Sequence, residues 1–137
     1  MTYECSADPG RIDGEVVWQC LWQQAYWERW RTRADVDRQL VAAWRLVGCY
    51  SSSGDLVGFA RSVSDGVAFG YLADVFVLPE HRGRGLGLGL RVVTAMVADP
   101  PADRFQWLLH TTDAHGLYAR LGFVPVGERL MQRLSLR

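Results

Sequence analysis

Residues 71–96, YLADVFVLPEHRGRGLGLGLRVVTAM, predict a strand, a glycine-rich loop and a helix in direct succession. The run from Leu72 to Leu78 is mostly apolar and rich in strand-forming residues, as in a buried central strand. Pro79 cannot donate to a sheet ladder and should end that strand. From Leu86 onward, apolar residues recur three or four positions apart, which is the helical period. The glycines therefore lie where a strand leads into a helix N-terminus.

This junction is suited to binding an anion. The first backbone N–H groups of a helix have no intrahelical partner, and the helix dipole places about half a positive charge there. Glycine allows the backbone to approach a ligand closely, and Arg82 and Arg84 add positive charge beside the loop. We expect a phosphate-bearing ligand here; a glycine-rich turn without a ligand is the alternative.

The loop lacks two common phosphate-binding fingerprints. It ends in Gly-Leu-Gly-Leu, whereas a Walker loop ends in Gly-Lys-Ser/Thr, and Leu88 or Leu90 occupies the last glycine position of a Rossmann G-x-G-x-x-G. The pattern that fits is Arg-x-x-Gly-x-Gly, formed by Arg82, Gly85 and Gly87 after a strand. In this pattern and setting the chain resembles the GNAT superfamily of N-acetyltransferases, at their acetyl-CoA pyrophosphate loop.

A second motif supports the resemblance. Residues 116–123, GLYARLGF, are similar to the Leu-Tyr-x-x-Leu-Gly-Phe of that superfamily, whose tyrosine lies close to the CoA sulfur. The resemblance implies that Tyr118 is the general acid, a role open to a phenol because a thiolate leaving group needs only a weak acid. A structural Tyr118 is the alternative. Many members carry an asparagine shortly before this tyrosine, and residues 111–116 have none, so its CoA contacts are not expected here.

The resemblance implies direct transfer of an acetyl group from acetyl-CoA, a co-substrate, to a primary amine. A backbone N–H near Val77 would polarise the thioester carbonyl, and no acyl-enzyme on a cysteine is required. No H-x-x-E-H or similar grouping is present, so no metal is expected. The donor-binding residues implied are Val75, Phe76, Val77, Arg82, Gly83, Arg84, Gly85, Leu86, Gly87 and Leu88.

The general base has several candidates. Asp74 lies in an otherwise apolar strand, where a carboxylate is costly unless it is exposed or paired. It is therefore either a catalytic base or a structural carboxylate bonded to a neighbouring strand or loop. His110 ends a predicted strand and His115 begins the helix of the tyrosine, and imidazole titrates near neutral pH. A water relay is a further alternative, whereas Glu80 and His81 are expected to be turn residues.

The first helix, predicted from about Gly14, has two apolar faces. Val17, Cys20 and Leu21 form one face, and four aromatic residues repeat every four positions on another if the helix is long enough: Trp18, Trp22, Tyr26 and Trp30. One apolar stripe normally suffices for a surface helix. The aromatic stripe is therefore core packing, a homodimer contact, or an acceptor-pocket wall formed by Trp22, Tyr26 or Trp30, since aromatic faces attract cationic amines.

The whole chain limits the remaining choices. Its 137 residues suit a single domain, 1–137, and its formal net charge of zero favours neither nucleic acid nor an anionic membrane as a partner. No apolar run is long enough for a membrane span, and there is no signal-peptide pattern. Three cysteines, odd in number and far apart, favour a reducing, cytoplasmic setting.

The expected fold class is α/β (α+β), a GNAT-like mixed and mostly antiparallel sheet of six or seven strands with about four helices on both faces. Beyond the central strand, strands are expected at 46–50, 56–62, 105–110, 123–126 and 129–134, with one more possible before the first helix. A short helix at 114–121, capped by Asp113, should carry the tyrosine.

Two rival functions remain. A CoA-binding or sensing module without catalysis is favoured if the acceptor pocket beside Val77 is plugged. A phosphate-loop hydrolase is disfavoured because the loop lacks the lysine and acid that it needs. The sequence leaves the acceptor open between an antibiotic, a polyamine, an amino acid and a protein N-terminus.

Overall fold

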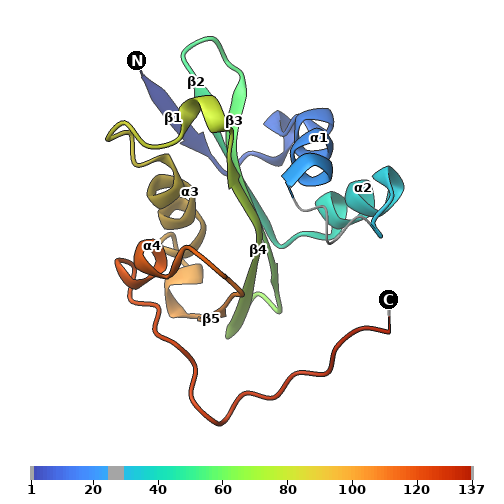
Figure 1. Cartoon of the computed structure of the whole chain (residues 1–137), viewed down its shortest axis with the longest axis vertical. Helices are drawn as coiled ribbons and strands as arrows, with labels where there is room; N and C mark the ends of the chain where they lie inside the picture. The colour runs from blue at the N-terminus through green and yellow to red at the C-terminus, as the bar shows by residue number, and fades with distance from the viewer. Residues whose placement is uncertain (1, 25–29, 137) are drawn as a thin grey trace.

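The computed structural model describes residues 2–24 and 30–136 of the chain, and its centre is a five-stranded sheet (Figure 1). The strands follow one another across the sheet in chain order. The first four are antiparallel and the fifth is parallel to the fourth. They are β1 (Tyr3–Ser6), β2 (Arg45–Ser51), β3 (Leu56–Ser64), β4 (Phe69–Val77) and β5 (Gln106–Leu108).

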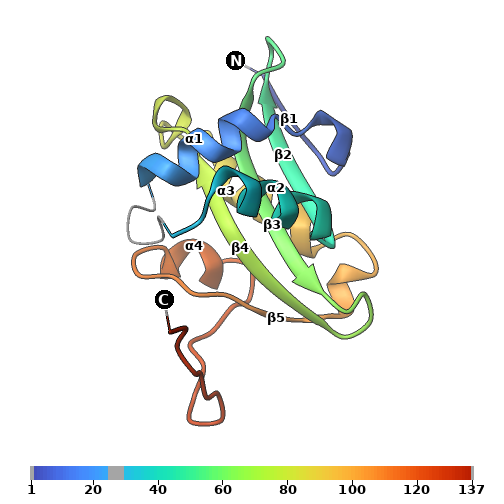
Figure 2. The same cartoon turned by 90° about the vertical axis from the view of Figure 1, so that its right-hand side faces the viewer.

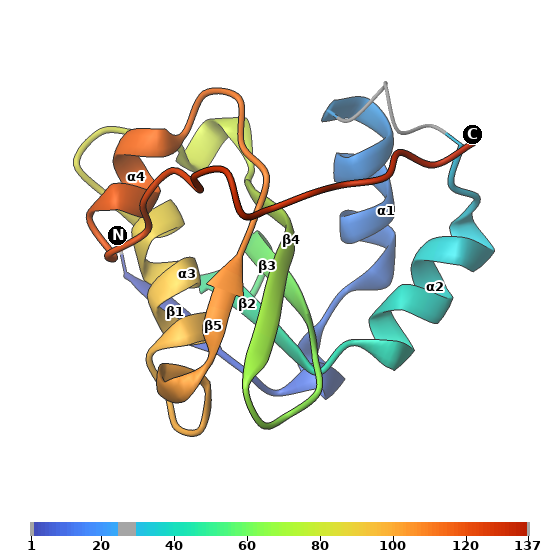
Figure 3. The same ribbon diagram turned by 90° about the horizontal axis from the view of Figure 1, so that it is seen from below.

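Four α-helices cover the two faces of this sheet, as Figures 1 and 3 show: α1 (Gly14–Gln24) and α2 (Arg33–Ala42) on one face, α3 (Leu88–Val97) and α4 (His115–Ala119) on the other. The Asp13 carboxylate accepts hydrogen bonds from the first N–H groups of α1. Thr32 and Asp35 form a capping box at the start of α2. The mixed, mostly antiparallel sheet with helices on both faces is confirmed.

Each face of the sheet has its own apolar core. Beneath α3 and α4, Val92 and Met96 are fully buried in one cluster with residues of β2 to β4. Beneath α1 and α2, Val17 packs in a second cluster that includes Phe59 and Phe76, whose rings stack with centroids 5.4 Å apart. The second cluster fixes α1 beside the carboxyl end of β4, where the candidate site lies.

The helix α3 begins two residues later than its apolar spacing predicted. Its N-cap is Gly87, whose left-handed φ of 63° is not helical, so Leu86 stays in the loop. The fully buried residues of α3 are Leu88, Val92, Val93 and Met96, while Leu86 and Val97 are partly buried against the same core. The helix N-terminus therefore lies directly after the last glycine of the loop.

A bulge interrupts β4 next to the site. Phe59 pairs with Phe76 and Arg61 with Ala73, so β4 has one more residue than β3 over this interval. Asp74 takes up the irregularity with a left-handed φ of 55°. Beyond Tyr71, β4 is no longer paired with β5, because the two parallel strands pair only over residues 69–71 and 106–108. The sheet is therefore open between the carboxyl ends of β4 and β5.

The expected six or seven strands are reduced to five because residues 123–136 form no strand. A strand needs a neighbour for its backbone N–H and C=O groups. Here the chain leaves α4 and extends away from the sheet instead of returning beside β5 (Figure 2). Its apolar side chains are largely exposed, reaching 97% at Leu136. No helix in the described part of the chain is long and apolar enough to cross a membrane.

Candidate active site

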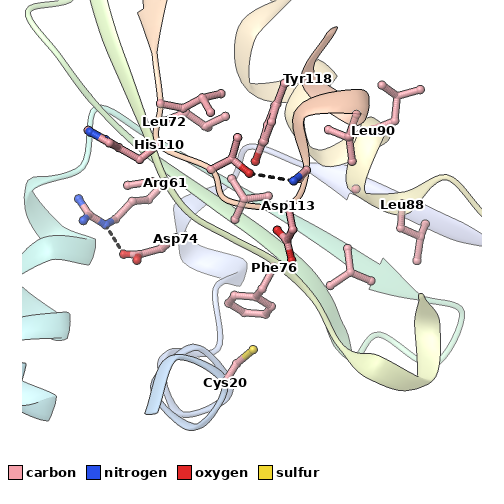
Figure 4. Close-up of a pocket in the computed structure, with 18 of the residues that line it drawn as sticks. Cys20, Arg61, Leu72, Asp74, Phe76, Leu88, Leu90, His110, Asp113 and Tyr118 are labelled. Carbon is pink, nitrogen blue, oxygen red and sulfur yellow. Dashed lines mark hydrogen bonds and ion pairs between the residues drawn. The ribbon is translucent and has the colours of Figure 1, made fainter. Parts of the chain in front are cut away.

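A cavity of about 1220 Å³ begins where β4 and β5 separate. It is lined by 71–77 of β4, by 81–83 and 87–90 of the loop and α3, and by 109–114 after β5. Tyr118 and its neighbours on α4 close one side (Figure 4). The far end is formed by Trp30, Arg31, Gln39 and Arg61. The cavity thus connects the glycine loop to a cluster of charged residues, and we call its two parts the donor end and the acceptor end.

The donor end is a loop of left-handed residues. Gly83, Gly85 and Gly87 have φ values of 67°, 71° and 63°, and Arg84 has 53°. A Cβ added at any of the three glycines would meet no heavy atom within 4 Å, so φ and not crowding requires glycine. Gly83 and Gly87 line the cavity, whereas Arg84, Gly85 and Leu86 belong to the loop but do not line it.

The first turn of α3 faces the same space. Leu88, Gly89 and Leu90 line the cavity, and their N–H groups, as the first of an α-helix, have no intrahelical partner. Open room in front of the glycines and unused helix N–H groups are what a pyrophosphate needs. The geometry of the loop therefore fits the phosphates of a CoA thioester.

The two loop arginines are engaged with the backbone of the loop. Arg82 Nε donates to the Val77 carbonyl at 2.6 Å, and the Arg84 guanidinium donates to the Glu80 carbonyl. Arg82 lines the cavity and Arg84 does not. They brace the turn between β4 and α3 and place two positive charges beside it.

Tyr118 projects from α4 into the cavity (Figure 4). Its side chain is 9% exposed, and its ring packs edge-on against Phe123 with centroids 5.7 Å apart. The hydroxyl makes no hydrogen bond to any part of the chain that the structure describes. Burial, and secondly the negative charge of Asp113, raise the pKa of Tyr118 above its ordinary value. The phenol therefore keeps its proton throughout the neutral range.

Helix α4 does not begin as expected. Its N-cap is Ala114, with no side-chain cap, so the capping role expected for Asp113 is wrong. The Ala114 N–H instead donates to Thr111 Oγ1 at 3.0 Å, and Asp113 faces the cavity.

Asp74 is paired with two arginines at the acceptor end. Arg31 donates to both carboxylate oxygens, at 2.9 and 3.1 Å, and Arg61 Nε donates to Oδ2 at 2.7 Å. Burial alone would raise the pKa of Asp74, but the hydrogen bond from Arg31 and the charges of Arg61 and Arg31 outweigh burial and lower it. These contacts match the structural alternative for Asp74, because so acidic a carboxylate accepts protons poorly near neutral pH.

The two candidate histidines lie in different places. His110 lines the cavity, and its Nδ1 is 2.5 Å from the Tyr71 hydroxyl. Its Nε2 is 3.1 Å from Gln132 Oε1, in the C-terminal segment. His115 lies on α4, is exposed and does not line the cavity. His81, expected as a turn residue, also lines the cavity and bonds to the Tyr3 hydroxyl at 2.8 Å.

The aromatic stripe is divided. Trp30 lines the acceptor end and is 46% exposed. Trp22 is 41% exposed but does not line the cavity, and it packs on Trp18 with ring centroids 5.4 Å apart. Tyr26 lies outside the described residues.

Sequence reasoning missed several residues of the acceptor end: Arg31, Gln39, Arg61 and Tyr71. Their one signal was Asp74, whose position in an apolar strand required partners without saying which. No group of three or more His, Cys, Asp or Glu side chains in residues 2–24 and 30–136 could hold a metal ion.

Comparisons with known proteins agree with this geometry. Residues 14–123 match the model of the acetyltransferase (GNAT) family. A crystal structure from Xanthomonas campestris, described as a candidate acetyltransferase of the GNAT family, shares 36% identity and superposes with a TM-score of 0.87 over 98% of this chain and 94% of that one.

More distant proteins agree in fold. Glucosamine-6-phosphate N-acetyltransferase from Arabidopsis thaliana has a TM-score of 0.62 at 13% identity, over 98% of this chain and all of that one, a likeness of fold alone. A candidate acetyltransferase of Gibberella zeae is 30% identical over 82% of this chain, and this alignment spans 63% of the fungal protein's length. The family match and the fold together show that this chain belongs to the GNAT family of acetyltransferases.

Proposed function

We propose that this protein transfers an acetyl group from acetyl-CoA to a primary amine on a small molecule or peptide. The observation that carries the proposal is the continuity of the cavity. The glycine loop, Tyr118 and the Arg61 cluster all line the same space, so a thioester bound at one end would meet an acceptor entering at the other.

Donor binding would rest mainly on the backbone. The pyrophosphate of CoA fits against Gly83, Gly87 and the first N–H groups of α3, where no side chain fills the space. The pantetheine arm would then lie along the side of β4 that has no strand neighbour beyond Tyr71, near Val75 and Val77. An extended amide chain can pair with such an open strand edge.

The chemical step needs little from the protein. The neutral amine attacks the thioester carbonyl, a C–N bond forms, and the C–S bond breaks. A backbone N–H of β4 near Val77 would stabilise the developing oxyanion. Tyr118, which burial keeps protonated, would give its proton to the departing sulfur.

We assign the amine proton to His110, directly or through water. Of the three candidate bases, His110 lines the cavity and its ring nitrogens are bonded to neutral groups, the Tyr71 hydroxyl and Gln132 Oε1, so the amine proton would reach Nδ1 in place of or through the Tyr71 hydroxyl. Asp74 is held by two arginines, and His115 does not line the cavity.

The rival function, a CoA-binding module without catalysis, would suit a plugged acceptor pocket. Here the cavity reaches past Val77 as far as Trp30 and Arg61, so space for a second substrate is present. This open acceptor end favours the enzyme.

The test is acetyl-CoA turnover against a panel of primary amines, with thiol release and the mass of the product measured together. We expect thiol release that depends on the amine and a product heavier by one acetyl group. Tight acetyl-CoA binding by calorimetry with no amine-dependent release would instead support the binding module.

A further inference from the structure

The Arg61 guanidinium has hydrogen-bonding capacity that the described part of the chain does not use. Arg61 Nε donates to Asp74 Oδ2 at 2.7 Å. Within residues 2–24 and 30–136, this is the one hydrogen bond that the Arg61 side chain makes. Neither Nη atom has a partner in that part of the chain, although the side chain is only 13% exposed. Arg61 lines the acceptor end of the cavity (Figure 4).

Asp74 does not satisfy this guanidinium. Both carboxylate oxygens are already bound by Arg31, whose side chain is 5% exposed and also donates to Gln39 Oε1 at 3.0 Å. One carboxylate balances one of the two guanidinium charges. A largely buried charge is costly unless it is paired, so the free side of Arg61 favours an incoming anion.

The opposite charge lies toward the tyrosine. Asp113 faces the cavity beside Tyr118 and raises its pKa, and Figure 4 shows both residues away from the Arg61–Asp74 pair. The cavity therefore offers the Asp113 carboxylate near the expected reaction centre, where Arg82 and Arg120 also line it, and at the acceptor end a guanidinium whose Nη atoms are unbonded within the described residues. A molecule with an amine at one end and an anion at the other matches this distribution.

We propose that the acceptor is an amine that also carries a carboxylate or a phosphate, and that Arg61 binds this anionic group. The two Nη groups of a guanidinium form a planar fork that suits both anions. The inference rests on the proposed acetyl transfer, since it names the acceptor class of the same site. It makes Arg61 a residue that determines specificity.

The test compares acceptors in pairs that differ only in the anion. β-Alanine is paired with its carboxamide, and phosphoethanolamine with ethanolamine, with longer homologues of each to vary the distance from amine to anion. We expect kcat/KM to be at least tenfold higher for the anionic member of one series. The series with the larger ratio identifies the anion as carboxylate or phosphate.

Variants then locate the effect. In Arg61→Gln the ratio should fall toward one, and in Arg61→Lys it should be partly restored. Arg38→Gln removes the same charge from α2 outside the cavity and should leave the ratio unchanged. A wild-type ratio near one in both series, or a ratio that survives Arg61→Gln, overturns the inference.

A binding measurement distinguishes failure of the anion site from failure of the proposed acetyl transfer. If no amine is acetylated, calorimetry of β-alanine and phosphoethanolamine on the CoA-saturated protein still tests the anion site. Binding that is lost in Arg61→Gln but kept in Arg38→Gln supports the site without the reaction. No binding of either probe, or equal binding by both variants, contradicts it.

Discussion

The two ends of the cavity differ in composition: one is formed by backbone groups and the other by side chains. The donor end is backbone, namely glycines in left-handed conformations followed by the first N–H groups of α3. The acceptor end is a set of charged side chains held by ion pairs between Arg31, Asp74 and Arg61. The binding groups of a backbone site are fixed by the conformation of the main chain. The side chains of the other site can be substituted while the backbone keeps its conformation. We therefore expect changes at the donor end to affect all acceptors alike, and changes at the acceptor end to alter selectivity.

The largest effect should come from Asp74→Asn. The change leaves two largely buried guanidinium groups without their carboxylate, and breaking such a pair costs on the order of 3 kcal/mol. Urea denaturation at neutral pH measures the loss in free energy of unfolding. A loss below about 1 kcal/mol would mean that the acceptor end does not depend on this ion pair.

The stability lost in Asp74→Asn should also depend on pH. The pKa of Asp74 is lowered in the folded protein, so its stabilising contribution is complete above the unfolded-state pKa near 3.9 and is lost as pH falls through the folded-state value. The stability difference between wild type and Asp74→Asn should therefore be constant from pH 7 to about 5 and shrink below about pH 4. A difference that persists at the lowest pH would assign it to packing instead of charge.

Tyr118→Phe tests the point where the two ends meet. It keeps the ring against Phe123 but removes the proton that we assign to the departing sulfur. We expect kcat to fall by roughly 10² for every acceptor, while acetyl-CoA affinity by calorimetry is little changed. A normal kcat would mean that solvent or another group protonates the thiolate. A loss confined to some acceptors would contradict the division between the two ends.

Gly87→Val tests the backbone nature of the donor end. The added side chain would occupy open space beside the first N–H groups of α3, and acetyl-CoA affinity should fall at least tenfold, about 1.4 kcal/mol. The variant also imposes strain, because φ at Gly87 is 63°. Gly54→Val is the matched control: its φ is 87°, it has equally open surroundings, and it lies in the β2–β3 turn. Equal affinity in both folded variants would place CoA elsewhere.

The sequence predicted the donor end better than the acceptor end because the donor end is local. The strand, loop and helix of residues 71–96 are contiguous, so periodicity and glycine placement were enough to order them. Even there, the start of α3 was missed by two residues, since a left-handed Gly87 cannot be read from apolar spacing.

The acceptor end is assembled from distant residues. Arg31 is 43 positions from Asp74, and Arg61 is 13 positions from it on the neighbouring strand. The sequence showed that Asp74 needed a partner, but only the strand register and the path after α1 determine which arginines reach it. The strands expected at 123–126 and 129–134 were wrong for a related reason. Alternating apolar residues indicate strand propensity, and a strand forms only where another strand offers its edge.

The smallest predicted effect concerns Trp30. It tests how far the acceptor-binding surface extends from the charged residues. Trp30 lines the cavity and is half exposed, so its ring can contact an acceptor amine or its apolar body. Such a contact contributes about 0.5–1 kcal/mol, and Trp30→Ala should raise the acceptor KM about threefold with acetyl-CoA binding unchanged. Trp22→Ala is the control, because Trp22 is similarly exposed, packs on Trp18 and does not line the cavity.

If Trp22→Ala raises the acceptor KM equally, the pocket wall extends along α1. If it instead changes the sedimentation coefficient, the exposed ring belongs to a homodimer contact. An unchanged KM in both variants would leave the charged side chains as the sole basis of acceptor binding.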